Sequence, residues 1–298
     1  MSATDRPAGM QSAAQPDTAA ADAGWPAAPG DAAPSDAAAP RAASAGARRA
    51  RVMAVTSGKG GVGKTYVSAN LAAALARRGE RVLVLDADLG LANLDVVLNL
   101  APRTTLHDVF TGRAELEDAV TPAPGGFSVL LAGSGLVEYS RLTTEVRDKL
   151  VEAIATMAPR YDRIVIDTGA GISDVVLHAV SLAEEVLLVV TSEPTAMTDA
   201  YATIKVLSQQ QRRAAVQLVV NQTERLGEAR TIRNQLQLVI DRFVNPAAEV
   251  PVKVQLLGEI PADPAVRESV RRRRLLLEAY PGSPAAKAIG TIAQRLAP

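Results

Sequence analysis

The sequence predicts an α/β protein with a doubly wound, mostly parallel sheet and helices on both of its faces. Short apolar runs alternate with segments of helical period from residue 51 onward. Most of these runs are continuous in Val, Ile and Leu, which is typical of strands covered on both faces. A glycine-rich loop joins the first run to the first helical segment. Strands that alternate with helices in this way form parallel sheets with ligands at the carboxyl ends of the strands.

The apolar runs give seven expected strands, over residues 52–57, 81–88, 127–133, 163–169, 185–192, 216–221 and 252–260. Each is bounded by a segment that is polar or of helical period. Functional residues are therefore sought in the loops that follow these strands.

Two of the helical segments have a clear apolar stripe. Residues 64–78 carry their stripe on Val67, Leu71 and Leu75, and Gly79 stands where that helix is expected to stop. Residues 228–243 carry theirs on Ile232, Leu236, Ile240 and Phe243. Both segments are long enough to cover a strand.

Residues 1–49 are expected to form a disordered, Ala- and Pro-rich tail, followed by one domain over residues 50–298. The tail is almost free of Val, Ile, Leu and Phe, so little apolar burial could offset the entropy of ordering it. It has no apolar region behind a basic start, and no stretch of the sequence approaches the ~18 apolar residues of a spanning helix. We expect a cytoplasmic protein, with a peripheral position at the inner face of the membrane or at a cell pole left open.

Composition excludes two classes of function. The 298 residues contain no cysteine, which excludes disulfides and Cys-ligated iron–sulfur clusters, and with them an iron-protein type of cluster carrier. The formal net charge is zero, so no overall basic field would attract DNA, and a DNA partner is not expected.

The segment GKGGVGKT follows the first expected strand and begins the first expected helix. Its glycines let successive backbone N–H groups face phosphate oxygens, and the helix N-terminus adds its dipole. The lysine at position 64 would neutralise the outer phosphates, and the hydroxyl of the next residue would bind Mg²⁺. We therefore predict an ATP and Mg²⁺ site, with nucleotide contacts from Gly58, Lys59, Gly60, Gly61, Val62, Gly63, Lys64, Thr65 and Tyr66.

Two acidic loops also follow strands. Asp86 and Asp88 come after the second strand, and Asp167 ends a later one. A carboxylate that ends an apolar strand is costly unless a cation or hydrogen-bond donors meet it. Mg²⁺ and an attacking water are the expected partners beside a phosphate loop. A role as simple helix caps stays open for each of them.

Lys59, which precedes the glycines in KGGVGKT, resembles the lysine of the deviant Walker A loop of MinD/ParA ATPases. DADLGLAN and VIDTGAGISD are similar to the two switches of that family, and VVNQTE and GEIPADPAVRESV to its adenine-binding loops. The resemblance implies a homodimer that forms with ATP, in which Lys59 reaches the partner's nucleotide and Asp88 positions water. It also implies Mg²⁺ ligation by Thr65, Asp86 and Asp167, phosphate binding by Lys64, and adenine contacts from Asn221 and Pro261.

Within this family, the segments LDADLGLANLDVVL, EPTAMTDAYATIK and LLEAYPGSPAAKAIGTIAQRL are most similar to the FlhG/FleN branch of flagellar-number regulators. The resemblance implies a slow ATPase that acts as a switch on flagellar number or placement. Its implied partners are an FlhF-like GTPase, a flagellar transcription activator and basal-body proteins. The DQAxxLR element that many of these regulators carry is not found in residues 1–50, which puts stimulation of the GTPase in doubt.

Two alternative functions stay open at this point. A MinD-type division-site regulator is expected to carry a membrane helix, whereas residues 284–297 offer a mostly small apolar face on Ala285, Ile289, Ile292, Ala293 and Leu296. We expect that face to pack on the domain and membrane binding to be weak or absent. A ParA-type DNA- or cargo-positioning ATPase usually has DxDPQ in its first switch, where this sequence has DADLG.

Overall fold

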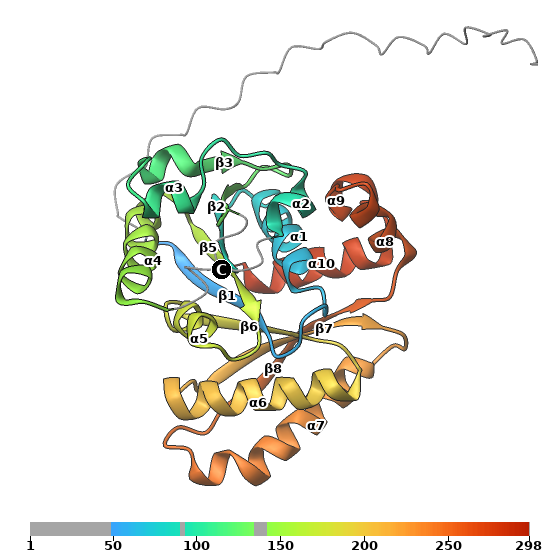
Figure 1. Ribbon diagram of the computed structural model, residues 1–298. Helices are drawn as coiled ribbons and strands as arrows, with labels where there is room; N and C mark the ends of the chain where they lie inside the picture. Colours follow the sequence, from blue (N-terminus) through green and yellow to red (C-terminus); the bar gives the residue numbers. More distant parts are fainter. Residues whose placement is uncertain (1–48, 90–92, 134–141, 298) are drawn as a thin grey trace, which may run out of the picture. The chain divides into compact units, whose positions relative to one another are not determined.

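The structure is a computed structural model that describes residues 49–89, 93–133 and 142–297 (Figure 1). The tail expected over residues 1–49 lies outside the described residues, except for Arg49. Part of the first switch, residues 90–92, lies outside them as well.

Eight strands form one sheet, in the order β3-β4-β2-β5-β1-β6-β7-β8. Every neighbouring pair is parallel except β3 with β4, so the predicted doubly wound, mostly parallel sheet is confirmed. The strands are β1 Arg51–Ser57, β2 Val82–Ala87, β3 Val120–Pro122, β4 Ser128–Leu130, β5 Arg163–Ala170, β6 Glu185–Val190, β7 Ala215–Thr223 and β8 Lys253–Pro261. The short, proline-containing β3 was not among the expected strands.

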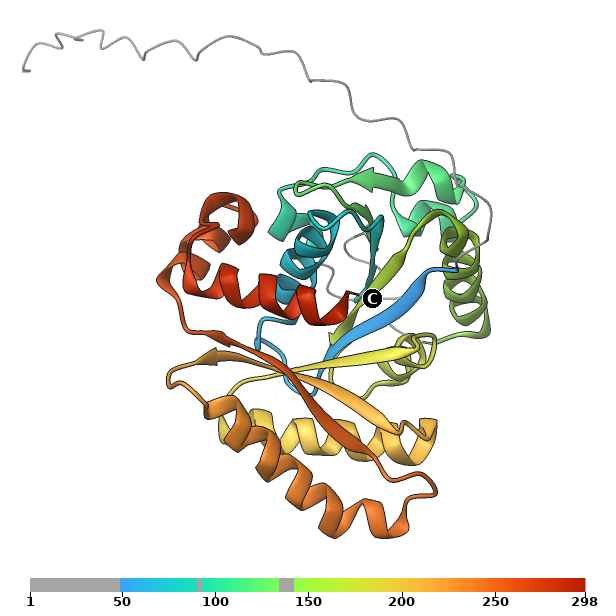
Figure 2. The same ribbon diagram turned by 180° about the vertical axis from the view of Figure 1, so that it is seen from behind.

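Helices cover both faces of this sheet, as Figures 1 and 2 show from opposite sides. α4, α5, α6 and α7 lie on one face, and α1 and α10 lie on the other, with α8 and α9 beside α1. Their bounds are α1 Lys64–Ala76, α2 Leu94–Leu98, α3 Leu106–Phe110, α4 Thr144–Met157, α5 Asp174–Ser181, α6 Pro194–Gln211, α7 Glu228–Phe243, α8 Pro264–Arg271, α9 Leu276–Ala279 and α10 Pro284–Leu296. Short 3-10 turns occupy Leu116–Ala119, Ala158–Arg160 and Asn245–Ala247.

The two helices predicted from apolar stripes form where expected. The three stripe residues of α1 are buried, and Gly79 follows that helix with a φ of +91°. In α7 the stripe is buried through Ile240, but Phe243, predicted to continue it, is 59% exposed. The chain leaves the helix at this point, and the next residue, Val244, is fully buried in its place.

Helix α10 packs on β8 and α1 and buries the whole face that the sequence predicted, Ala285, Ile289, Ile292, Ala293 and Leu296. The contact with β8 is close at Gly258, where an added Cβ would lie 2.4 Å from Ile292 Cγ1. Across the described ranges, none of the helices reaches the combination of length and apolarity that crossing a bilayer requires.

Replacing Gly258 by alanine should destabilise the protein by about 1–3 kcal/mol, because the new methyl group overpacks the contact with Ile292. The measurement is the midpoint of urea unfolding. Gly290→Ala in α10 is the matched control, since an added Cβ there meets nothing within 4 Å and alanine favours a helix. Equal midpoints for Gly258→Ala and the wild type would contradict this account of the α10 contact.

Candidate active site

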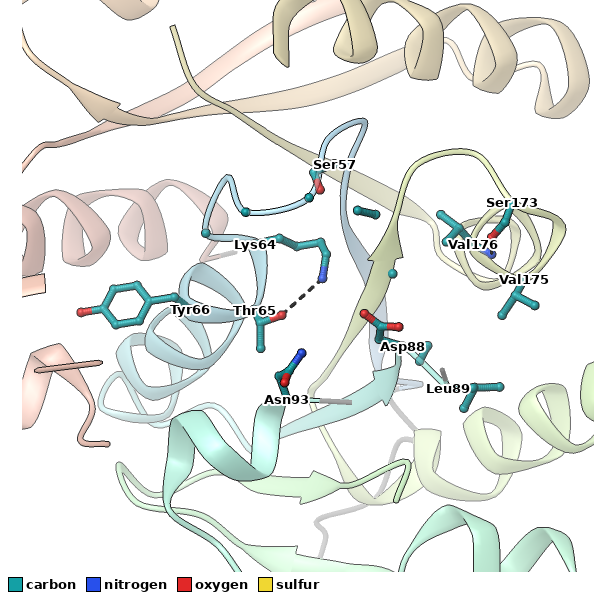
Figure 3. A pocket seen from close by; sticks show the side chains of 16 residues that line it. Ser57, Lys64, Thr65, Tyr66, Asp88, Leu89, Asn93, Ser173, Val175 and Val176 are labelled. Atoms are coloured by element: carbon teal, nitrogen blue, oxygen red, sulfur yellow. Dashed lines mark hydrogen bonds between the residues drawn. The ribbon is translucent and has the colours of Figure 1, made fainter. Parts of the chain in front are cut away.

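The loop between β1 and α1 turns on glycines that no other residue could replace without strain. Gly61 and Gly63 have φ values of +81° and +89°, and Gly63 is the N-cap of α1. The loop lines a cavity of about 830 Å³ at the carboxyl ends of β1, β2 and β5 (Figure 3). The cavity lies where a doubly wound sheet binds its ligand, at the N-terminus of a helix.

Lys64 lies at the floor of this cavity in a buried ion pair. Its Nζ is 3.1 Å from Asp167 Oδ1, and the two side chains are 8% and 1% exposed. Nζ also donates to Thr65 Oγ1 over 3.3 Å. Ser68, one helical turn further along α1, donates to the same Asp167 oxygen over 2.9 Å. α1 and β5 are thus joined through charges at the point where phosphate groups would enter.

Asp86 lies beside Asp167 on the neighbouring strand, and the two residues are register partners. Asp86 Oδ1 accepts a hydrogen bond from the Asp88 backbone N–H over 3.1 Å, while Oδ2 is buried without a hydrogen-bond partner in the described part of the chain. Burial raises the pKa of Asp86 well above its ordinary value, and the negative charge of Asp167 raises this pKa further.

The orphaned oxygen of Asp86 fits a site for a divalent cation. No group of three or more His, Cys, Asp or Glu residues that could hold a metal occurs among the described residues. Mg²⁺, however, is usually bound by one or two protein oxygens together with phosphates and water. Thr65 and Asp167 both contact Lys64 Nζ, and Asp86 is the register partner of Asp167, so these three residues are the candidates to supply such oxygens.

Asp88 follows the end of β2 and lines the cavity (Figure 3), and its Oδ1 lies 3.4 Å from where an added Cβ on Gly169 of β5 would be. Asp88 is half-buried and lines the cavity together with Asn93 of the first switch. The structure thus brings Asp88 together with Lys64 and Thr65 around one cavity, as the sequence predicted.

Lys59 is directed elsewhere. Its Nζ lies 2.5 Å from Glu193 Oε2 and 2.8 Å from Thr195 Oγ1, at the start of α6, and it does not line the phosphate cavity. The preceding Gly58 lies against the same helix, since an added Cβ would be 2.3 Å from the backbone oxygen of Asp199. The partners Glu193 and Thr195, which follow the sixth strand in the segment EPT, were not predicted from the sequence.

The two residues predicted to contact adenine lie at the ends of neighbouring strands, β7 and β8. Asn221 is 7% exposed, and its Nδ2 donates to Val62 O in the phosphate loop over 2.8 Å. Pro261 lines a separate cavity with Thr223. Neither residue lines the phosphate cavity, so adenine contact stays a prediction.

Tyr66 lines the rim of the phosphate cavity, but its ring points away from Lys64 (Figure 3). Its hydroxyl is 2.7 Å from Ser269 Oγ of α8, and burial raises the pKa of Tyr66 to about 12. Tyr66 therefore links the first turn of α1 to α8. Ser68 was also missed, although its position four residues after Lys64 on a helix places both on one face.

Residues 48–297 match the ParA family described as NUBPL iron-transfer P-loop NTPase. The chain is similar to the antiactivator FleN of Pseudomonas aeruginosa, with 44% identity over 83% of this chain and 86% of FleN. It is 32% identical to the flagellum site-determining protein YlxH of Helicobacter pylori over 82% of this chain and 80% of YlxH. The septum site-determining protein MinD of Pyrococcus horikoshii, solved as a complex with Mg-ADP, is 30% identical, with a TM-score of 0.67 over 83% of this chain and 96% of that one.

The raised pKa of Asp86 predicts that Asp86→Asn stabilises the nucleotide-free protein. The folded state penalises the charged carboxylate, so stability is lost as pH rises from the unfolded pKa, about 3.9, towards the higher folded pKa. The gain from the substitution should therefore be larger at pH 8 than at pH 5, reaching about 1–3 kcal/mol. Urea unfolding at both pH values measures it.

Asp148→Asn on the exposed surface of α4 is the control, and its effect should stay within about 0.5 kcal/mol at both pH values. A loss of stability in Asp86→Asn at pH 8 would contradict the assignment of Asp86 as a costly buried charge.

Proposed function

This chain belongs to the ParA/MinD family of P-loop ATPases, and from that membership we propose that it is an ATP-dependent dimerising switch that regulates flagellar number or placement. The family assignment makes it a nucleotide-binding ATPase and a regulator of the MinD/ParA type. The observation that carries the flagellar role is its similarity to a flagellum site-determining protein and to an antiactivator, each over at least 82% of this chain.

In the proposed mechanism, the amides of residues 58–65 hold the phosphates of ATP, and Lys64 leaves Asp167 to contact the outer phosphates. Thr65, Asp86 and Asp167 would hold Mg²⁺, which neutralises charge on the β- and γ-oxygens. Asp88, on the wall facing the second switch, orients the attacking water. The buried oxygens of Asp86 and Asp167 support this assignment, because a cation offsets the cost of their burial.

In the proposed mechanism, dimerisation requires Lys59 to give up its contacts with Glu193 and Thr195 of the same subunit. In the proposed ATP-bound dimer, Lys59 contacts the phosphates of the partner subunit, and Asn221 and Pro261 contact adenine. The ion pair of Lys59 with Glu193 competes with that arrangement. Both side chains are at least one-third exposed, so breaking this ion pair costs little free energy. It should therefore raise the ATP concentration needed for dimerisation only modestly.

The proposed partners follow from the same relatives. An antiactivator acts against an activator, so a flagellar transcription activator is the first proposed partner, with an FlhF-like GTPase and basal-body proteins as others. We propose a cytoplasmic location, with peripheral recruitment to the membrane or a cell pole by partners. DNA is not a proposed ligand. The apolar face of α10 is buried against β8 and α1, so we do not propose this face as a membrane anchor.

The similarity to MinD of Pyrococcus horikoshii supports division-site regulation as the second candidate function. Deletion of the chromosomal gene, followed by electron microscopy of flagella and septa, distinguishes the two. A changed number or position of flagella with normal septa is expected. Misplaced septa with normal flagella would favour the division-site role.

Asp88→Ala should bind ATP with Mg²⁺ about as well as the wild type but hydrolyse it at least about a hundredfold more slowly, because no side chain orients the water. The variant should therefore accumulate as a dimer. Phosphate release and size-exclusion chromatography with ATP measure the two effects. Asp148→Ala, an exposed acid on α4, is the control. Normal turnover by a monomeric Asp88→Ala protein would refute the role of Asp88.

Substitutions of the two lysines should have different effects. Lys64→Ala should weaken ATP binding itself, whereas Lys59→Ala should keep ATP binding and lose ATP-dependent dimerisation. Glu193→Ala should lower the ATP concentration needed for dimerisation by up to about fivefold, because it releases Lys59. Calorimetry and light scattering measure binding and dimerisation, with Glu115→Ala as an exposed control. Equal loss of ATP binding in both lysine variants would rule out action of Lys59 across the dimer.

A further inference from the structure

A buried amide contacts the phosphate loop from outside the cavity. Asn221, near the end of β7, is 7% exposed, and both ends of its side chain are in use. Nδ2 donates to Val62 O over 2.8 Å, and Oδ1 accepts from the backbone N–H of Gln222 over 3.0 Å. The Val62 side chain is buried as well, and neither Asn221 nor Val62 lines the phosphate cavity. The amide therefore holds the loop at a point where no phosphate would lie.

The backbone of β7 is irregular beside this amide. The register between β7 and β8 shifts between Asn221 and Thr223, and Gln222, between them, has a φ of +59°. A left-handed conformation is unfavourable for a residue with a side chain, so it persists only where the surrounding contacts fix it. One such contact is the bond from the Gln222 N–H to Asn221 Oδ1. Irregularities of this kind in a strand serve to aim a side chain near a functional site.

The hydrogen bond to Val62 O fixes one peptide group of the loop. The C=O and N–H of a trans peptide lie in one plane and point in opposite directions. Asn221 holds the carbonyl of the peptide between Val62 and Gly63, so it also fixes the Gly63 N–H, which points away from Asn221. Gly63 lines the phosphate cavity and is the N-cap of α1. Backbone N–H groups at such a position bind phosphate oxygens.

This peptide needs an external contact because glycines flank it. Gly61 and Gly63 both have positive φ values, and a glycine backbone can adopt several conformations of similar energy. The contact is also close, since an added Cβ on Gly63 would lie 2.5 Å from Asn221 Nδ2. Glycine at position 63 thus permits both the left-handed turn and the approach of the amide.

We propose that Asn221 is a positioning residue for phosphate binding, which acts through Val62 O to keep the Gly63 N–H directed at the phosphates. This role is separate from the adenine contact proposed above. It makes Asn221 important even for a ligand that has no base. The inference rests on the proposed function only in that the loop binds the phosphates of ATP.

The test compares two ligands of the full chain, a non-hydrolysable ATP analogue and inorganic triphosphate, which has no base. Both are titrated calorimetrically in the presence of Mg²⁺. Asn221→Ala should weaken the binding of both ligands by about fivefold or more, because the loop loses the hydrogen bond that orients Gly63. Gln217→Ala is the matched control, since it removes an amide of the same strand whose Oε1 has no hydrogen-bond partner among the described residues. Both ligands should bind this variant as they bind the wild type.

Weaker binding of the ATP analogue alone would overturn the proposal, because it would show that Asn221 acts only on the base. Unchanged binding of both ligands by Asn221→Ala would overturn it as well. Either outcome leaves the proposed function intact. A wild-type protein that binds neither ligand would refute the proposed function together with this inference.

Hydrogen exchange of the nucleotide-free protein provides a second measurement, which does not depend on the folding of the alanine variant. Asn221→Leu has about the size of asparagine but no group that could donate to Val62 O. The amides of residues 58–65 should exchange at least about twofold faster in Asn221→Leu than in the wild type or in Gln217→Ala. Equal exchange in all three proteins would contradict a role of Asn221 in fixing the loop.

Discussion

The buried ion pair between Lys64 and Asp167 is the interaction on which the candidate active site depends. Either charge alone would be costly at this depth, whereas the pair, with Ser68 as a further donor, offsets much of that cost. It fixes the first turn of α1 over the end of β5. The loop before it must therefore reverse within a few residues, which the positive φ angles of Gly61 and Gly63 permit. Asp86, beside the pair, is left with an orphaned oxygen that suits a cation.

Local patterns predicted the sheet, the bounds of α7 and the placement of Lys64, Thr65 and Asp88 around one cavity, because these depend on period, strand ends and one contiguous motif. Contacts between distant segments were not predictable in this way. Lys59 and Glu193 are 134 residues apart, and nothing in either segment indicates the other. β3 was missed because three residues that include a proline carry no strand period. Phe243 continues the apolar stripe of α7 in the sequence, but its side chain is exposed, and the next residue, Val244, is buried instead.

The two ends of the sheet carry different kinds of charged side chains. At the carboxyl ends, acids and one lysine surround a glycine loop, which suits phosphates accompanied by a cation. At the amino ends, arginines begin the strands β1 and β5 and meet Glu80, Glu185 and the backbone of α10. A parallel sheet gathers the first residues of its strands at one edge. Single arginines that look unremarkable in sequence therefore become a cluster only in the fold.

The bond from Arg51 to Leu296 spans 245 residues of chain. At synthesis rates of 5–20 residues per second, roughly 12–49 s separate the emergence of its two ends from the ribosome. Until Leu296 has been synthesised, Arg163 Nη2 also lacks the backbone oxygen to which it donates in the folded protein. Burial of Arg163, and the packing of α10 on β8 and α1, can be completed only after residue 296 has emerged. The nascent chain is thus expected to keep this edge hydrated, and accessible to chaperones, until synthesis is nearly finished.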